Sequence, residues 1–182
     1  QNEDPQVVER YGKGFGERML LARRLCEAGC GFVTIKEGTW DFHGLSNNGT
    51  IVDGMNRKGP ELDQVVSTFI EDIYARNLQD DILLVITGDF GRTPKILTQQ
   101  PPGRQHWPRC FSSIMAGCGI AGGQVYGKTD RLAGYVAHNP VRPEEFSATI
   151  YHALDIPLNE PQNNTGISRP ITTGKPIMEL FG

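Results

Sequence analysis

No apolar run in this 182-residue sequence approaches the roughly 20 residues that a helix needs to cross a bilayer. The sequence therefore predicts no membrane insertion. Basic residues are also few, because 18 lysines and arginines stand against 21 acidic residues, a formal net charge of -3. They form no cluster that would neutralise a nucleic-acid backbone. We expect no nucleic-acid partner.

Cysteine is scarce as well, with four residues and no C-x-x-C pair. Cys26 and Cys30 are one helical turn apart, while Cys110 and Cys118 bracket an apolar segment. We expect four buried free thiols. A disulfide between Cys110 and Cys118 in an exported protein is the alternative, but a strand would hold its two ends well apart.

What the sequence does contain is the composition of a globular protein, with 38% hydrophobic and 21% charged residues. A chain of this length buries roughly 70% of its unfolded surface, so we expect one domain over residues 1–182. Apolar periodicity and turn residues predict the secondary structure. The expected elements are helices over 7–28, 60–77 and 143–154, strands over 32–36, 82–87 and 111–116, and a loop over 44–59.

The order strand, helix, strand over residues 32–87 is typical of a right-handed parallel crossover. Strands 32–36 and 82–87 would then end at the same edge of one sheet. Residues 89–110 contain several prolines and no helical stripe, so the next strand, 111–116, should run antiparallel. The predicted fold class is α/β, with a mostly parallel sheet and one antiparallel strand.

Four potential metal ligands follow or precede these strands: Asp41, His43, Asp89 and His106. A mixture of imidazole and carboxylate ligands suits a divalent transition metal, which polarises an ester and lowers the pKa of a bound water. Zinc and manganese are favoured, while calcium is disfavoured by the imidazoles and iron stays open. The competing interpretation is that Asp41 and His43 stabilise a glycine-rich turn and that Asp89 caps a helix.

Arg92 and Arg104 stand close to these ligands in the sequence. A guanidinium fork matches the oxygens of phosphate or sulfate, so both arginines are candidates to orient such an anion in catalysis. The alternative is that they are ordinary surface arginines. His138 and His152 lie away from the motifs, and we expect structural roles for them.

Several motifs in order, W-D-F-H, I-T-G-D-F-G-R-T-P, R-Q-H-W-P, G-G-Q-V-Y-G-K-T-D and A-T-I-Y-H-A-L-D-I, resemble an uncharacterised sulfatase-like bacterial family of the alkaline phosphatase superfamily, in its carboxyl-terminal portion. The resemblance covers residues 14–180. It implies an α/β/α sandwich, a site for one or two metals, and ligand roles for Asp41, His43, Asp89 and His106. It also implies an exported or periplasmic protein.

Two departures from that pattern concern the chemistry. Superfamily enzymes usually carry histidine where this chain has Phe90, which cannot bind metal. Their nucleophile and another metal-binding acid lie in a segment that would precede Gln1, so we expect the chain to lack its amino-terminal part. A sheet without its first strands exposes an edge, which predicts self-association or a separate partner segment.

The leading functional prediction is a metal-dependent hydrolase of phosphate or sulfate monoesters, or the carboxyl-terminal part of one, acting on a small anionic ester. The attacking group would lie outside this chain. The alternative is a noncatalytic metal- or glycan-binding module on the same scaffold.

Overall fold

The computed structural model describes residues 3–38, 40–44, 49–97, 102–158 and 170–182. The chain divides into two compact units. The first contains residues 1–78 and 92–107, and the second contains residues 79–91 and 108–182. Whether both fold together as one domain over residues 1–182 stays a prediction.

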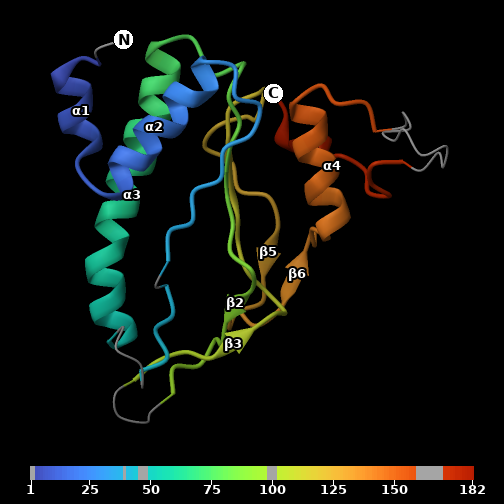
Figure 1. Cartoon of the computed structure of the whole chain (residues 1–182). Coiled ribbons are helices and arrows are strands. Elements are labelled where there is room, and N and C mark those ends of the chain that lie inside the picture. Colours follow the sequence, from blue (N-terminus) through green and yellow to red (C-terminus); the bar gives the residue numbers. More distant parts are fainter. Residues whose placement is uncertain (1–2, 39, 45–48, 98–101, 159–169) are drawn as a thin grey trace, which may run out of the picture. The chain divides into compact units, whose positions relative to one another are not determined.

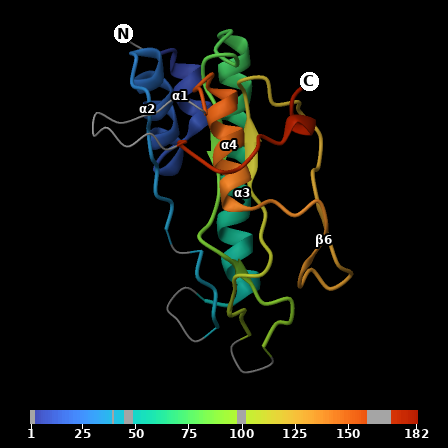
Figure 2. The same ribbon diagram turned by 90° about the vertical axis from the view of Figure 1, so that its right-hand side faces the viewer.

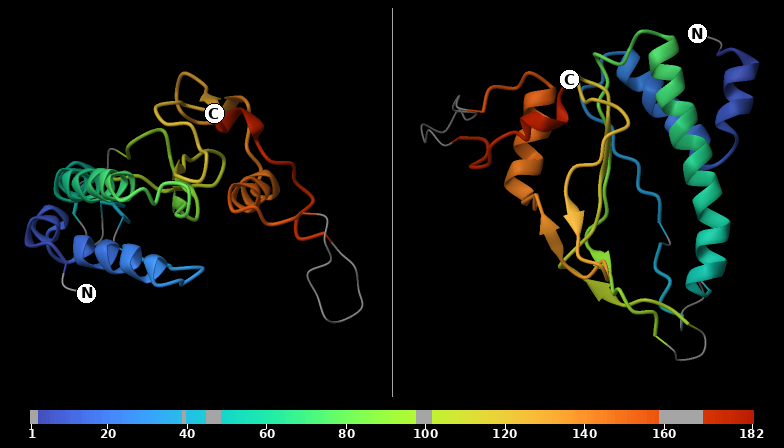
Figure 3. Two further views of the ribbon diagram at one scale, coloured as in Figure 1. Left: turned by 90° about the horizontal axis from the view of Figure 1, so that it is seen from above. Right: turned by 180° about the vertical axis from the view of Figure 1, so that it is seen from behind.

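Three helices make up most of the first unit: α1 (Pro5–Tyr11), α2 (Phe15–Glu27) and α3 (Ile51–Ala75). The single helix predicted over 7–28 is therefore two helices. Gly12 and Gly14 separate them with positive φ angles of 72° and 64°, which glycine adopts without strain. Both short helices lie against the carboxyl-terminal part of α3 (Figure 1), and the view from above shows the three as one group (Figure 3).

The end of α2 follows the sequence prediction. Gly29 adopts a φ of 90°, and its N–H donates to the carbonyl of Cys26 at 2.9 Å. The N–H of Cys30 donates to the carbonyl of Leu25, also at 2.9 Å. These two bonds form the Schellman arrangement that terminates helices at glycine. The predicted stop at Gly29 is confirmed.

Helix α3 begins well before the predicted start at Pro60, so the loop expected over 44–59 is wrong from residue 51 onward. The Thr50 side chain accepts a hydrogen bond from the Asp53 N–H at 3.1 Å and caps the helix. Pro60 lies inside α3. The predicted apolar stripe is confirmed, because Val65, Phe69 and Ile73 are buried to 3% exposure or less.

A buried ionic network joins the three helices. Arg23 of α2 is only 1% exposed, and its Nε donates to Asp72 of α3 at 3.0 Å. Asp72 also accepts from Tyr11 Oη of α1 at 2.9 Å and from Arg76 Nε at 2.9 Å. Burial is the main cause that raises the pKa of Tyr11, and the negative charge of Asp72 raises it further. One carboxylate thus connects all three helices.

Residues 32–38 are extended but form no strand among the described residues, so the strand predicted over 32–36 is wrong. Phe32 is 83% exposed, which a central strand would not allow. Figure 2 shows this segment descending from the end of α2. Glu37 instead accepts a hydrogen bond from Lys58 Nζ of α3 at 2.9 Å. The contact of this segment with α3 is therefore made by Glu37 and not by a buried strand.

The second unit contains short antiparallel pairs and one helix. Strand β1 (Leu84–Ile86) pairs with β4 (Ile114–Ala116), with Val85 opposite Met115. Strand β5 (Lys128–Thr129) pairs with β6 (Val136–His138), and α4 (Pro143–Ala153) and a 3-10 turn, η1 (Met178–Leu180), follow. Helix α4 confirms the helix predicted over 143–154. The predicted antiparallel direction of 111–116 is confirmed in its last residues.

The predicted fold class is wrong. Four α-helices and short two-stranded sheets replace the mostly parallel sheet of an α/β/α sandwich in the described part of the chain. The main reason is that β1 pairs antiparallel with β4, while residues 32–38 pair with no strand among the described residues. All four cysteines are free thiols, and only Cys118 is buried. Among the helices that the structure describes, none combines the length and apolarity needed to span a membrane.

Candidate metal centre

Two segments far apart in the sequence meet in the first unit. Strands β2 (Gly91–Arg92) and β3 (His106–Trp107) pair, and the Thr93 N–H donates to the Gln105 carbonyl at 2.8 Å. The Arg104 N–H donates to the Phe42 carbonyl at 3.0 Å, which docks this pair onto residues 42–44. The structure thereby brings Arg92 and His106 beside the loop that carries Asp41 and His43.

Gly103 makes this docking possible. A Cβ atom at this position would lie 2.1 Å from the carbonyl carbon of His43 and 2.4 Å from the nitrogen of Gly44. Backbone atoms cannot yield to such a contact as a flexible side chain can. Only glycine therefore allows the two segments to approach this closely.

Asp41 Oδ1 is the centre of the cluster. It lies 2.6 Å from His43 Nε2, 2.8 Å from Arg92 Nη2 and 3.8 Å from His106 Nε2. The two imidazole rings have centroids 4.9 Å apart. One ligand atom from each of Asp41, His43 and His106 lies within 4.8 Å of the others. The structure therefore brings together three of the four predicted ligands.

Burial differs among these groups. The side chains of Asp41 and His106 are 47% and 55% exposed, whereas that of His43 is 19% exposed. His43 Nδ1 is buried and has no hydrogen-bond partner among the described residues. A buried ring nitrogen in a polar cluster is normally bound to hydrogen-bonding groups, ordered water or an ion. The cluster is thus open to solvent on one side and anchored by His43 on the other.

The distances between the ligand atoms of Asp41, His43 and His106 indicate whether one ion fits between them. Two ligands at about 2.05 Å from a tetrahedral zinc ion stand roughly 3.3 Å apart. The contact between Asp41 and His43 would open by about 0.7 Å, and that between Asp41 and His106 would close by about 0.5 Å to reach this spacing. Side-chain rotation provides shifts of this size, so the donor set fits a small divalent ion.

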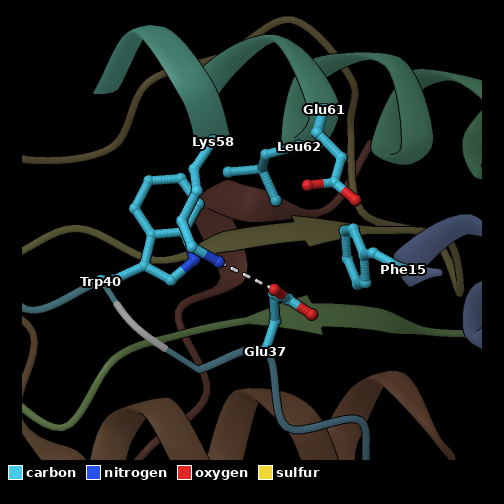
Figure 4. Close-up of a pocket in the computed structure, with 6 residues that line it drawn as sticks. All are labelled: Phe15, Glu37, Trp40, Lys58, Glu61 and Leu62. Carbon is cyan, nitrogen blue, oxygen red and sulfur yellow. Dashed lines mark hydrogen bonds and ion pairs between the residues drawn. The ribbon is translucent and has the colours of Figure 1, made fainter. Parts of the chain in front are cut away.

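A set of contacts just upstream anchors the loop that carries Asp41. Figure 4 shows Lys58, Glu61 and Leu62 of α3 facing Glu37 and Trp40, with Phe15 alongside. Lys58 Nζ donates to Glu37 and lies 5.6 Å from the centroid of the Trp40 ring. The hydrogen bond from Lys58 lowers the pKa of Glu37. This packing fixes the residue directly before Asp41.

Phe42 adds a second anchor. Its ring is 4% exposed and lies against Gly54 of α3, where a Cβ atom would approach it to 2.1 Å. Sequence reasoning missed Glu37, Lys58 and Gly54 because residues 44–59 were expected to form a loop. The spacing of Thr50 and Asp53, a typical helix-capping pattern, is the signal that would have revealed them.

The remaining predicted site residues differ in their contacts. Asp89 belongs to the second unit, where its carboxylate accepts a hydrogen bond from the Phe90 N–H at 2.9 Å. Arg104 donates from Nη1 to the Thr93 carbonyl at 2.9 Å and supports the β2–β3 pair. Arg92 is the predicted anion-binding residue that contacts the cluster directly, through Asp41. No finding tests the catalytic roles assigned to the two arginines.

These features define a chain of helices and short antiparallel sheets that carries a candidate site for one divalent metal ion. The chain belongs to the family described as protein of unknown function (DUF1501), whose model matches residues 1–181. No curated protein and no solved structure matches it. The expected membership of a sulfatase-like family of the alkaline phosphatase superfamily is therefore wrong, because neither the family match nor the sheet supports it.

Proposed function

We propose that this chain is, or forms part of, a divalent-metal-dependent hydrolase of phosphate or sulfate monoesters. The observation that carries the proposal is the convergence of ligand atoms from Asp41, His43 and His106 within 4.8 Å of one another. In catalytic zinc sites, three protein ligands of this mixed kind leave a position open for water or substrate. Zinc and manganese are favoured because both accept imidazole and carboxylate ligands.

The surroundings of the cluster support an anionic ester as the substrate. Arg92 lies beside Asp41, and its guanidinium fork matches the oxygens of phosphate and sulfate. The exposure of Asp41 and His106 leaves the cluster open to a small molecule. A divalent ion held there supplies the polarisation of the ester and the lowered pKa of an attacking water.

Metal content is the first test. The purified chain is loaded with Zn²⁺, dialysed, and examined by elemental analysis beside the variants Asp41→Asn and His106→Gln. We expect close to one zinc ion per chain, lost in both variants, because a three-ligand site does not hold its ion with two ligands. The control is His138→Gln, since His138 is an exposed histidine of the second unit. A chain that retains no zinc contradicts the proposal.

Hydrolysis is the second test, with 4-nitrophenyl phosphate and 4-nitrophenyl sulfate as substrates. We expect turnover that requires the metal and is lost in Asp41→Asn. Turnover would show that a water activated at the site is sufficient for attack on the ester. Stoichiometric zinc without hydrolysis of either ester would support the alternative, a noncatalytic metal-binding module.

A further inference from the structure

Arg92 contacts the same atoms that the metal would use. Its Nη2 lies 2.8 Å from Asp41 Oδ1, and its Nη1 lies 3.4 Å from His43 Nε2. The guanidinium cannot lose its proton under physiological conditions, so it offers only N–H donors to these two atoms. Arg92 and a metal ion therefore compete for Asp41 and would both lie beside His43 Nε2.

We propose that metal binding displaces Arg92 from Asp41 and frees it to bind a phosphate dianion, so that the metal and a phosphate monoester bind cooperatively. This inference rests on the proposed metal site and names its preferred substrate class. Arg92 holds Asp41 in place while no metal is bound. Arg92 contacts the phosphate oxygens once the metal is bound to the Asp41 carboxylate.

The position of Arg92 favours the exchange. An ion held by Asp41 Oδ1 and His43 Nε2 would bind the two atoms that Arg92 faces at 2.8 Å and 3.4 Å. Two positive groups this close repel each other strongly in a partly buried site. His43 stays as a ligand of the ion, so Arg92 is the group that moves away.

Arg92 has room to move. Its side chain is 27% exposed, and Nη2 lies 3.4 Å from the Trp40 carbonyl, beyond a strong hydrogen bond. Asp41, which it would leave, is 47% exposed. Displacement toward solvent therefore breaks the 2.8 Å contact with Asp41 at a partly exposed position.

Charge selects the anion. Without metal, the charges of Asp41 and Arg92 cancel. A divalent ion added to this pair leaves a local net charge of +2 if both imidazoles are neutral. A phosphate monoester dianion neutralises that charge, whereas a sulfate monoester, which carries a single negative charge, neutralises half of it. Opposite charges at such short range in a partly buried site attract strongly. The site therefore favours phosphate over sulfate monoesters.

The test uses methylphosphonate and methanesulfonate, which have the same shape but carry two charges and one charge at mildly alkaline pH. Calorimetry measures the Zn²⁺ affinity of the whole chain alone and with each anion. We expect methylphosphonate to raise the Zn²⁺ affinity about tenfold, within the usual range of coupling between sites, and methanesulfonate to change it about twofold at most. Zn²⁺ must raise methylphosphonate affinity by the same factor, because coupling is reciprocal.

The variant Arg92→Gln separates this exchange from direct attraction between metal and anion. We expect it to bind Zn²⁺ about tenfold more tightly than the unaltered chain without anion, and to lose most of the methylphosphonate effect. Arg131→Gln is the matched control, because Arg131 is an exposed arginine of the second unit. If Arg92→Gln does not fold, as judged by circular dichroism, the comparison of the two anions on the unaltered chain decides, because equal effects overturn the inference.

Different failures have different meanings. Three results overturn this inference and leave the metal site standing. The first is that neither anion alters Zn²⁺ affinity, and the second is that both anions raise it equally. The third is that methylphosphonate raises Zn²⁺ affinity as much in Arg92→Gln as in the unaltered chain. Both proposals are overturned if the unaltered chain does not bind Zn²⁺ even with methylphosphonate present and Arg92→Gln does not bind it either. Binding to Arg92→Gln alone supports the competition between arginine and metal.

Discussion

Replacement of Asp72 by asparagine tests the network that connects the three helices of the first unit. Asparagine keeps the shape of the side chain but removes its charge and turns an N–H₂ group toward donors. Asp72 is 7% exposed and accepts from Arg23, Tyr11 and Arg76 at 2.9–3.0 Å. The substitution therefore leaves the buried Arg23 with a weaker set of partners.

The size of the effect follows from burial. Loss of one partner in a buried ion pair costs about 3–5 kcal/mol, mainly because a charge stays buried without compensation. Arg23 still contacts Glu3 and Glu27, so the lower end applies. We expect Asp72→Asn to lower the free energy of unfolding by about 3 kcal/mol, or Tm by roughly 6–12 °C for a chain of this size.

Urea denaturation, followed in parallel by tryptophan fluorescence and circular dichroism, measures this loss. Coincidence of the two transitions supports the two-state analysis on which the free energy depends. The control is Glu71→Gln, because the ion pair of Arg10 with Glu71 is 51% and 64% exposed and such pairs contribute about 0–1 kcal/mol. An Asp72→Asn variant that loses less than about 1 kcal/mol, or no more than Glu71→Gln, would refute the reasoning.

Two further predictions concern α3 and the segment that packs on it. Glu37 has a pKa below its ordinary value of 4.5, chiefly through the hydrogen bond from Lys58, so its contribution to stability is present above pH 4.5 and is lost as pH falls through the lowered pKa. Urea denaturation between about pH 6 and about pH 3 should show a smaller loss of stability in Glu37→Gln than in the unaltered chain, and equal losses would contradict this. Gly54→Ala should destabilise the chain by about 1–3 kcal/mol through overpacking on Phe42, and an unchanged Tm would count against this packing.

Short-range signals in the sequence predicted where some helices begin and end better than they predicted which elements pack against each other. The stop at Gly29 and the start of α4 at Pro143 depend on short-range backbone geometry, which the sequence shows directly. The strand expected over 32–36 depended on a neighbouring strand, which the described residues do not provide; Glu37, just after it, contacts Lys58 of α3 instead. Because turn-forming residues precede Thr50, the sequence predicted a loop where Thr50 in fact caps the start of α3.

The candidate site shows the same contrast. The residue types of Asp41, His43 and His106 predicted a possible metal centre, and the structure brings these three together. The expected cause was wrong, because no shared edge of a parallel sheet gathers them. Docking of the β2–β3 pair through Gly103 does so, and this long-range contact depends on backbone packing that no spacing in the sequence reveals.

The docking at Gly103 also connects the site to the folding of the chain. Arg92 and His43 are 49 positions apart, and most of α3 lies between them. Two positions this far apart in the chain come together only at a substantial cost in loop-closure entropy. The cluster therefore forms only when α3 and the β2–β3 pair are both in place. An ion that binds this cluster has no comparable site in the unfolded chain. It would therefore shift the folding equilibrium by mass action, and metal-starved cells would hold this protein in a less stable and more readily degraded form.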